Sequence, residues 1–307
     1  MRCRTVIDAR RAASGVPDAR RYGLCAAAGA GTKFSMSADA SLARLLDHDA
    51  YPVAARDGAA RAALVERCRA QLAANGACEL PGFVTPAATA RMVAESDTLV
   101  PVAHHAEGPI TIYLDVADPS LPEDHPRRWL GRSSLAAVAY DLIPKAHALR
   151  ALFEWDPLME FLADVLGHAR LYRYADPFGA LNVAVMRDGD ELAWHFDQTD
   201  FVVSIALRDA DEGGDFEYAP YVRSAADERY DDVRTVLDGD PSRVRHVPMT
   251  PGTLLLFQGR HSLHRVTPIR GATSRLVALL AYDTKPGTVS SDFLRLARYG
   301  RNVPVEA

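Results

Sequence analysis

The stretch Ala193-Trp194-His195-Phe196-Asp197 carries two potential metal ligands two positions apart. Side chains at positions i and i+2 of an extended strand point to the same side, so His195 and Asp197 can reach one metal ion while Phe196 points away. A third potential ligand, His264, lies far along the chain and must return from another strand. Two imidazoles and one carboxylate hold non-haem Fe(II) on one face and leave the opposite positions open. The sequence therefore predicts an iron site built on neighbouring β-strands.

An arginine near the third ligand supports this hypothesis. A His-x-Asp pair is common by chance, and the chain has ten histidines, so neither feature alone indicates a metal. Arg275, however, follows His264 by eleven positions within a strand-like sequence. Strand alternation places it on the same face as Val277 and Leu279, so its guanidinium emerges among apolar side chains and requires a partner. The structural alternative is an ion pair between Arg275 and an acidic residue of the chain.

With this pattern the sequence resembles the Fe(II)/2-oxoglutarate-dependent dioxygenases, whose core is a double-stranded β-helix, or jelly roll. The resemblance covers residues 76–287. It implies that His195, Asp197 and His264 bind the iron and are the catalytic residues. It also implies that 2-oxoglutarate is the co-substrate. Arg275 would bind its distal carboxylate through two parallel charge-assisted hydrogen bonds.

A second stretch points to one branch of these enzymes. The sequence Gly213-Gly214-Asp215-Phe216-Glu217-Tyr218 is similar to the bacterial branch that modifies free amino acids, by hydroxylation or by halogenation. In the halogenases, Gly or Ala stands at the position of Asp197, and chloride fills the vacated site. Because the carboxylate is present here, the sequence predicts a hydroxylase. It would act on a C–H bond of a small polar substrate, such as a free amino acid or a derivative.

Three alternatives remain open. A halogenase, or another oxidative tailoring enzyme of the same superfamily, would use the same metal and co-substrate. A cupin-like small-molecule sensor without oxygenase activity could also hold a metal in a jelly roll, although cupins usually use more histidines and do not need Arg275. The enzyme could instead modify a protein partner, but no interaction repeat, coiled coil or basic groove in the sequence indicates one.

Other polar side chains near the predicted metal strands are candidates for binding the co-substrate or the substrate. Those that could hydrogen-bond 2-oxoglutarate are Asn182, Tyr172 and Tyr174. Those that could recognise an ammonium or carboxylate group of the substrate are Gln198, Asp200 and Glu217. Each of the three co-substrate candidates could instead satisfy a polar contact of the barrel, and turn chemistry accounts equally well for Asp200. Trp194 and Phe196 face away from the ligands and are expected in the core.

Composition restricts the class of protein. The 307 residues, 48% of them hydrophobic, suffice for one domain with a large core. The net charge of −5 gives no electropositive signature of a nucleic-acid partner. All four cysteines precede residue 79 without a Cys-x-x-Cys pair, which favours a reducing cytoplasm. No apolar run approaches the ~18 residues of a membrane span. We therefore expect a cytoplasmic enzyme whose partners are a small-molecule substrate and O2, with the oligomeric state left open.

The chain is expected to contain an amino-terminal extension and one α+β domain. Residues 1–35 are Arg-rich and lack apolar periodicity, so we interpret them as disordered or as a non-native extension before Met36. An Arg-rich transit peptide is the alternative. Residues 36–307 form the single dioxygenase domain, with a helical part at 36–169 and the jelly-roll core at 170–287.

Local signals predict the elements of this domain. A helix at 57–75 should end at Gly76, and further helices should begin with the N-cap residues Thr85 and Asp156, each followed by Pro. The charged segment 219–241 either covers the mouth of the site or is a solvated loop. Short runs rich in β-branched and aromatic residues predict strands at 77–80, 171–174, 180–186, 191–197, 201–207, 215–218, 243–247, 253–257, 262–267 and 275–282.

Overall fold

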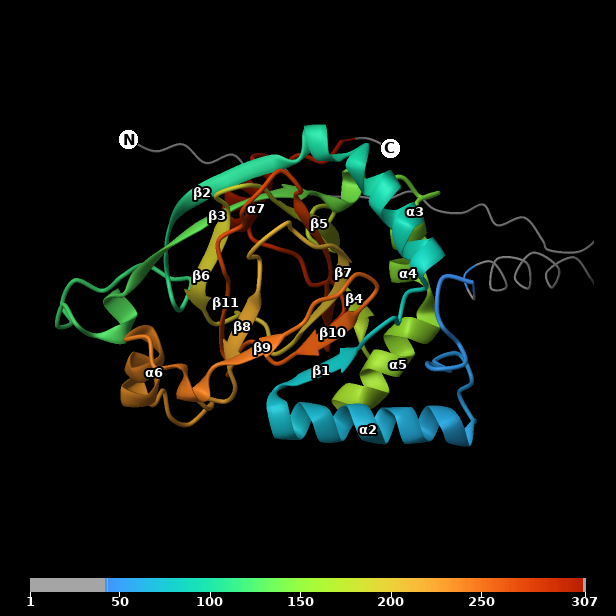
Figure 1. Ribbon diagram of the computed structural model, residues 1–307, viewed down its shortest axis with the longest axis horizontal. Helices are drawn as coiled ribbons and strands as arrows, with labels where there is room; N and C mark the ends of the chain where they lie inside the picture. Colours follow the sequence, from blue (N-terminus) through green and yellow to red (C-terminus); the bar gives the residue numbers. More distant parts are fainter. Residues whose placement is uncertain (1–41, 43, 306–307) are drawn as a thin grey trace, which may run out of the picture.

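The computed structural model describes residue 42 and residues 44–305 (Figure 1). The prediction for residues 1–35 and Met36 lies outside the described residues. The helices are α2 (Ala59–Asn75), α3 (Pro86–Asp97), α4 (Ala148–Glu154), α5 (Asp156–Leu166), α6 (Tyr230–Leu237) and α7 (Asp292–Tyr299). The strands are β1 (Ala77–Leu80), β2 (His104–Thr111), β3 (Leu130–Val138), β4 (Tyr172–Arg173), β5 (Leu181–Met186), β6 (Glu191–His195), β7 (Val202–Arg208), β8 (Phe216–Ala219), β9 (Arg245–Val247), β10 (Leu254–Phe257), β11 (Leu263–Val266), β12 (Arg275–Leu280) and β13 (Tyr282–Asp283). None of these helices is both long and apolar enough to cross a membrane.

The described residues form an 11-stranded antiparallel sheet that curves into a nearly closed barrel (Figure 1). Its strand order is β1-β10-β7-β12-β5-β3-β6-β11-β8-β9, and β2 pairs with β3 beside this path. Strands β4 and β13 form a separate two-stranded sheet. Because neighbours in the barrel come from distant parts of the chain, the topology is that of a jelly roll. The predicted fold class, an α+β jelly roll with amino-terminal helices, is confirmed.

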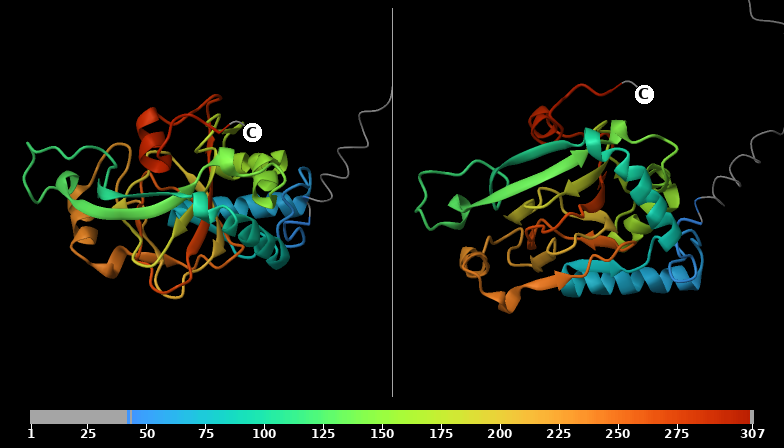
Figure 2. Two further views of the ribbon diagram at one scale, coloured as in Figure 1. Left: turned by 90° about the horizontal axis from the view of Figure 1, so that it is seen from above. Right: turned by 45° about the horizontal axis from the view of Figure 1, so that its top comes forward.

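The two faces of the sheet have different surroundings. On β5, Leu181 and Val183 belong to the main hydrophobic core, which also contains residues of helices α2 to α5. These helices cover one side of the barrel (Figure 2). Alternate residues of the same strand, Asn182 and Met186, therefore point into the barrel. Met186 pairs with Arg275 of β12, so the predicted co-substrate arginine shares this inner face.

Helix ends follow the local sequence, with one exception. Helix α2 ends at Gly76, whose φ of 69° lies in the left-handed region that glycine tolerates. Helix α3 begins with Thr85 as its N-cap, and the Thr85 hydroxyl accepts a hydrogen bond from the backbone N–H of Ala88. The prediction for α5 was wrong by one residue. Its N-cap is Trp155, and Asp156 is the first helical residue, where its charge favours the positive end of the helix.

The predicted division between a helical part and a jelly-roll core needs correction. Strands β1, β2 and β3 all precede residue 170, yet they join the main sheet, and β3 lies between β5 and β6. Strand β1 was predicted, but β2 and β3 were not. Strand β2 contains Gly108 and Pro109, and β3 contains Gly131, residues that have low intrinsic strand preference. Pairing with neighbouring strands decides their conformation.

The charged segment 219–241 also contains a helix that the sequence analysis missed. Helix α6 buries Val233 and Val236, which pack in a cluster with Trp194 and Phe196. The helix is short and its remaining residues are mostly polar, so its apolar face is visible only once the packing partner is known. This segment therefore packs against the outer side of the strand that carries His195.

We predict that Thr85→Ala will lower the free energy of unfolding by about 1 kcal/mol, because the substitution leaves an N–H of the first turn of α3 without its partner. Urea denaturation measures this change. Thr98→Ala is the matched control, since the exposed Thr98 hydroxyl donates to a carbonyl at the other end of the same helix. It should cost less than about 0.5 kcal/mol. Equal losses in the two variants would contradict the capping role.

Candidate metal and co-substrate site

The three predicted ligands lie together inside the barrel. His195 ends β6, Asp197 follows two residues later, and His264 lies on β11 directly opposite His195 in the strand register. The two imidazole centroids are 4.1 Å apart. One donor atom from each of the three residues lies within 4.8 Å of the other two. The strand pairing thus brings together ligands that are far apart in sequence.

Backbone carbonyls orient both imidazoles toward the same point. The Nδ1 atom of His195 lies 2.9 Å from the carbonyl oxygen of Ala193, and Nδ1 of His264 lies 3.0 Å from that of Ser262. A carbonyl can only accept, so each Nδ1 carries the proton and each Nε2 presents its lone pair. The two Nε2 atoms lie 3.9 Å and 3.5 Å from carboxylate oxygens of Asp197. This arrangement selects the tautomer that binds a metal through Nε2.

Electrostatics keep the ligands in the forms that bind a cation. Burial, followed by the charge of His264, lowers the pKa of His195 to about 3, so its ring is neutral near pH 7. Burial raises the pKa of the Asp197 carboxyl, but its interactions with His264, which include a hydrogen bond, and with His195 outweigh this effect, so the pKa is lowered overall. A neutral imidazole at His195 and an ionised carboxylate at Asp197 are the forms of these side chains that bind a cation such as Fe(II).

The Asp197 carboxylate occupies a confined space. Its backbone N–H donates to the carbonyl of Gly259, at 3.1 Å. A Cβ atom at Gly259 would lie 1.6 Å from Oδ2 of Asp197, so only glycine leaves room for the carboxylate. Oδ2 is buried and has no hydrogen-bond partner among the described residues. An oxygen that is buried and unpaired in this way fits a metal ligand.

Arg275 meets the requirements for binding an anion. Its side chain is 6% exposed, and Nη1 of its guanidinium contacts the sulfur of Met186 at 4.0 Å. Among the described residues Arg275 forms no ion pair. The negative charges of Asp209 and Asp215 act on its pKa, which they raise. Burial lowers the pKa of Arg275 to about 10. A buried guanidinium without a carboxylate partner fits the distal carboxylate of 2-oxoglutarate.

The glycine pair that precedes β8 shapes the space around this arginine. At Gly214, where φ is 73°, a Cβ atom would lie 2.8 Å from Cδ of Arg275 and 2.7 Å from a methyl group of Ile269. At Gly213, a Cβ atom would lie 2.0 Å from the carbonyl oxygen of Pro268. The absence of side chains at Gly213 and Gly214 therefore lets the backbone pass close to the aliphatic part of the Arg275 side chain.

The other predicted co-substrate residues are not grouped together. Asn182 points into the barrel, and its buried Oδ1 has no hydrogen-bond partner among the described residues, so it remains a candidate. Tyr172 belongs to the separate sheet of β4 and β13 and lines a surface cleft bordered by Arg170 and Asp156. Tyr174 packs against the main core on the helix side of the barrel. The two tyrosines therefore do not face the metal ligands, and this part of the hypothesis is corrected.

The predicted substrate residues occupy three different environments. Gln198 donates from Nε2 to the carbonyl of Leu114, at 3.2 Å. The Asp200 side chain is 76% exposed and pairs with Arg260. Glu217 was wrongly assigned. Strand alternation turns it to the outer face of β8, where it pairs with a neighbouring arginine and is directed away from the ligands.

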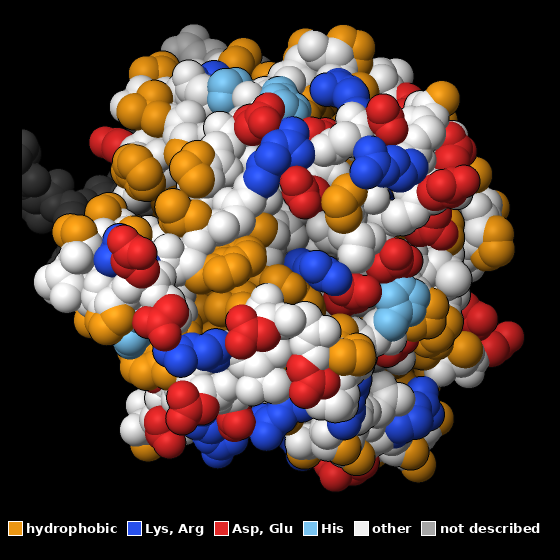
Figure 3. Space-filling model, turned by 60° about the vertical axis from the view of Figure 1, so that its left-hand side comes forward, with side chains coloured by type: hydrophobic (Ala, Val, Ile, Leu, Met, Phe, Trp, Pro, Cys, Tyr) orange, Lys and Arg blue, Asp and Glu red, His pale blue; other side chains and the backbone are white. Residues whose placement is uncertain are grey.

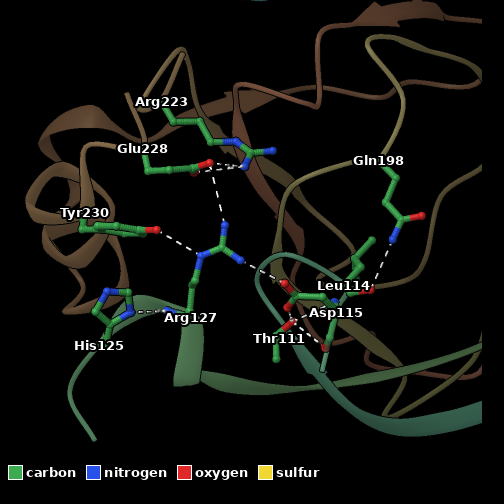
Figure 4. A network of polar contacts seen from close by, with 9 residues as sticks. All are labelled: Thr111, Leu114, Asp115, His125, Arg127, Gln198, Arg223, Glu228 and Tyr230. Atoms are coloured by element: carbon green, nitrogen blue, oxygen red, sulfur yellow. Dashed lines mark hydrogen bonds and ion pairs between the residues drawn. The ribbon is translucent and has the colours of Figure 1, made fainter. Parts of the chain in front are cut away.

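A polar network beside the metal strand was not predicted (Figure 4). Arg127, from the β2–β3 connection, donates from Nε to the Tyr230 hydroxyl at 3.0 Å and lies 3.9 Å from Glu228. Glu228 also pairs with Arg223, at 3.1 Å, and the Arg223 guanidinium stacks 4.1 Å from the centre of the Phe196 ring. This network joins two loops to the outer side of the metal strand. Local sequence signals could not have revealed the contacts of Arg127, because Tyr230 and Glu228 lie about a hundred residues away along the chain.

The jelly roll, the ligand triad and the buried arginine define the class of this protein as an Fe(II)- and 2-oxoglutarate-dependent oxygenase. The sequence matches the family model described as Halogenase D over residues 60–291, which is most of the chain. The protein therefore belongs to the halogenase D family.

Solved structures with a similar fold come from the same superfamily. One is the non-haem α-ketoglutarate-dependent carbocyclase SnoK from nogalamycin biosynthesis, with 14% identity, a TM-score of 0.50, and coverage of 79% of this chain and 93% of that chain. Another is the epimerase SnoN in complex with Fe3+, α-ketoglutarate and nogalamycin RO, with 15% identity, a TM-score of 0.50, and coverage of 72% and 84%. At these identities the likeness establishes the fold alone. No curated protein sequence matches the chain.

We predict that His264→Ala will abolish stoichiometric binding of Fe(II) and metal-dependent turnover, because two remaining ligands cannot hold the ion on one face. Anaerobic equilibrium dialysis with Fe(II) measures binding, and circular dichroism checks the fold. His168→Ala, at an exposed position outside the triad, is the control and should bind iron normally. Unchanged iron binding by the His264 variant would remove this residue from the site.

We also predict that Arg275→Ala will raise the 2-oxoglutarate concentration needed for half-maximal turnover by more than tenfold at fixed iron. Loss of one partner of a buried charge pair costs roughly 2–5 kcal/mol. Arg208→Ala is the matched control. It removes an arginine from the neighbouring strand that already has Asp97 as its partner. If both variants keep the native 2-oxoglutarate dependence, Arg275 is not the anchor.

Proposed function

We propose that this enzyme hydroxylates a C–H bond of a small polar substrate, a free amino acid or a close derivative. The observation that carries the proposal is Asp197, a carboxylate that completes the ligand triad with His195 and His264. When bound, iron and 2-oxoglutarate supply an oxidative decarboxylation that converts O2 into an oxidant of C–H bonds. The chain holds these partners and excludes competing ligands.

Asp197 favours oxygen transfer because it leaves no room for a halide among the protein ligands. A halide bound to the metal would need the position that the carboxylate takes. Gly259 lies so close to this carboxylate that even a methyl group would collide with it, which indicates a tightly filled space.

Halogenation is the second candidate, and the family match supports it. The chain belongs to a family described as Halogenase D, and its resemblance to enzymes that modify free amino acids includes halogenating members. Under this hypothesis, Asp197 would have to leave the metal so that chloride could bind. The two functions share the fold, the cofactors and the anchor Arg275, so they differ in the role of a single residue.

A small substrate is supported by the surface and by the site. The face drawn in Figure 3 mixes acidic and basic side chains and shows no continuous basic band of the kind that binds nucleic acid. Arg275 also argues against a metal-binding sensor of the cupin type, because such a protein has no need of a buried, unpaired cation next to the metal.

The deciding experiment is product analysis with 18O2. The enzyme is loaded anaerobically with Fe(II) and 2-oxoglutarate, mixed with a panel of free amino acids in chloride buffer, and exposed to 18O2. We expect succinate and a product heavier by one labelled oxygen, without a chlorinated product. A chlorinated amino acid from the native enzyme would replace this proposal by halogenation. Turnover on proteins alone would refute a small substrate.

Asp197→Gly provides the matched variant. Removing the carboxylate should abolish most hydroxylation, because iron loses a ligand, and should permit at most weak chlorination. Reactions in sulfate buffer without halide are the control for the chlorinated product. Full hydroxylation by this variant would show that the carboxylate is not a ligand.

A further inference from the structure

The turn between β10 and β11 sets the position of the Asp197 carboxylate. The backbone N–H of Asp197 donates to the carbonyl of Gly259, and a Cβ atom at Gly259 would lie 1.6 Å from Oδ2 of Asp197. Strand β6 ends at His195, so Asp197 lies beyond the strand and its pairing with β11 does not hold it. The place of this carboxylate therefore depends on how firmly the turn that contains Gly259 is held.

Arg223, from the connection between β8 and α6, binds the two residues that follow Gly259. Its Nε atom donates to the carbonyl oxygen of Arg260, at 2.6 Å. Its backbone N–H makes a longer contact of 3.5 Å with the carbonyl oxygen of His261. A hydrogen bond from a charged guanidinium is stronger than one between neutral groups. Arg223 thus fixes the backbone of the turn directly after Gly259.

The same guanidinium packs against the segment that carries two of the ligands. It lies 4.1 Å from the centre of the Phe196 ring, where the attraction between a cation and an aromatic face applies. Phe196 is the residue between His195 and Asp197, and it is 1% exposed. Arg223 therefore contacts the ligand segment with its guanidinium face and the Gly259 turn with its Nε atom. One side chain holds the two segments together.

An ion pair fixes Arg223 in this position. Glu228 accepts from Nη1 of Arg223 at 3.1 Å and also lies 3.9 Å from Arg127, as Figure 4 shows. The Arg223 side chain is only 12% exposed, and its charge is already balanced by this carboxylate. Unlike Arg275, it does not require an anionic ligand as a partner. Its contacts indicate that it acts on the position of other groups.

We propose that Arg223 is a positioning residue, which keeps the Asp197 carboxylate on the metal by holding the Gly259 turn against the ligand segment. The inference rests on the proposed function in taking Asp197 as an iron ligand, and it names the residue that keeps this ligand in place. Without Arg223, the turn and the ligand segment lose their common contact, and the carboxylate is less well positioned. Binding of Fe(II) then weakens, although all three ligands are still present.

Arg265 provides a matched control on the same strands. Its guanidinium lies 4.7 Å from the centre of the Trp194 ring, and its Nε atom donates to Glu217 at 2.7 Å. Trp194 precedes His195, as Phe196 follows it. Within the described part of the chain, the Arg265 side chain makes no hydrogen bond to the Gly259 turn. Arg265→Gln therefore removes the same two kinds of contact, an ion pair and a stacked ring, without releasing the turn.

The test is anaerobic equilibrium dialysis of the full chain with Fe(II), which measures binding without turnover. We expect Arg223→Gln to weaken Fe(II) binding more than tenfold and Arg265→Gln to weaken it less than threefold. Circular dichroism checks that both variants are folded. The visible absorption of the protein loaded with Co(II) gives a second readout, because it reports on the coordination geometry. It should change in Arg223→Gln and stay native in Arg265→Gln.

Two results would overturn the proposal: native Fe(II) affinity in Arg223→Gln, or equal weakening in Arg265→Gln. If Arg223→Gln does not fold, Arg223→Lys takes its place. Lysine keeps a positive charge but cannot reach the Arg260 carbonyl and Glu228 from two separate nitrogens, so binding should weaken at least threefold. Native affinity in this variant would then contradict the proposal. Failure of the proposed hydroxylation is distinguishable, since it appears in the products of the 18O2 experiment and not in metal binding.

Discussion

The pairing of β6 with β11 is the constraint on which the site depends. This register places His264 opposite His195, and the local carbonyls then turn both Nε2 atoms toward Asp197. The direction of each histidine follows from its strand position, whereas Asp197 follows two residues after the end of β6. The helices of the amino-terminal part contribute indirectly, because they bury the opposite face of the barrel and stabilise its curvature.

The interior of this barrel combines an apolar lining with polar and charged groups that lack a hydrogen-bond partner among the described residues. Arg275 is buried beside Met186, and Oδ2 of Asp197 and Oδ1 of Asn182 lack hydrogen bonds among the described residues. Such groups destabilise a folded chain unless ligands satisfy them. Their number and their concentration on one face of the sheet distinguish a binding interior from a packed core. Stability and ligand affinity are therefore coupled in this protein.

Family membership and ligand chemistry point to different products of one catalytic apparatus. The family model that the chain matches is described as Halogenase D, whereas the carboxylate of Asp197 completes a triad suited to oxygen transfer. A fold can host several reactions, so the reaction is argued from the site rather than from the family name. Gly259 lies so close to Asp197 that the carboxylate is part of the local packing. The position of the carboxylate, and with it the proposed hydroxylation, therefore depends on the backbone at Gly259.

The sequence by itself predicted the grouping of His195, Asp197 and His264, the inward direction of Arg275 and the jelly roll, because these depend on strand alternation and on short-range residue preferences. It also located most strands, the Thr85 cap and the outward direction of Trp194. Tertiary structure decided the side-chain directions and strand pairings that residue spacing does not predict. It turned Glu217 outward, moved Tyr172 to a separate sheet, and paired the weak strand formers of β2 and β3. These outcomes depend on register and on packing between distant segments, and no local pattern encodes either of them.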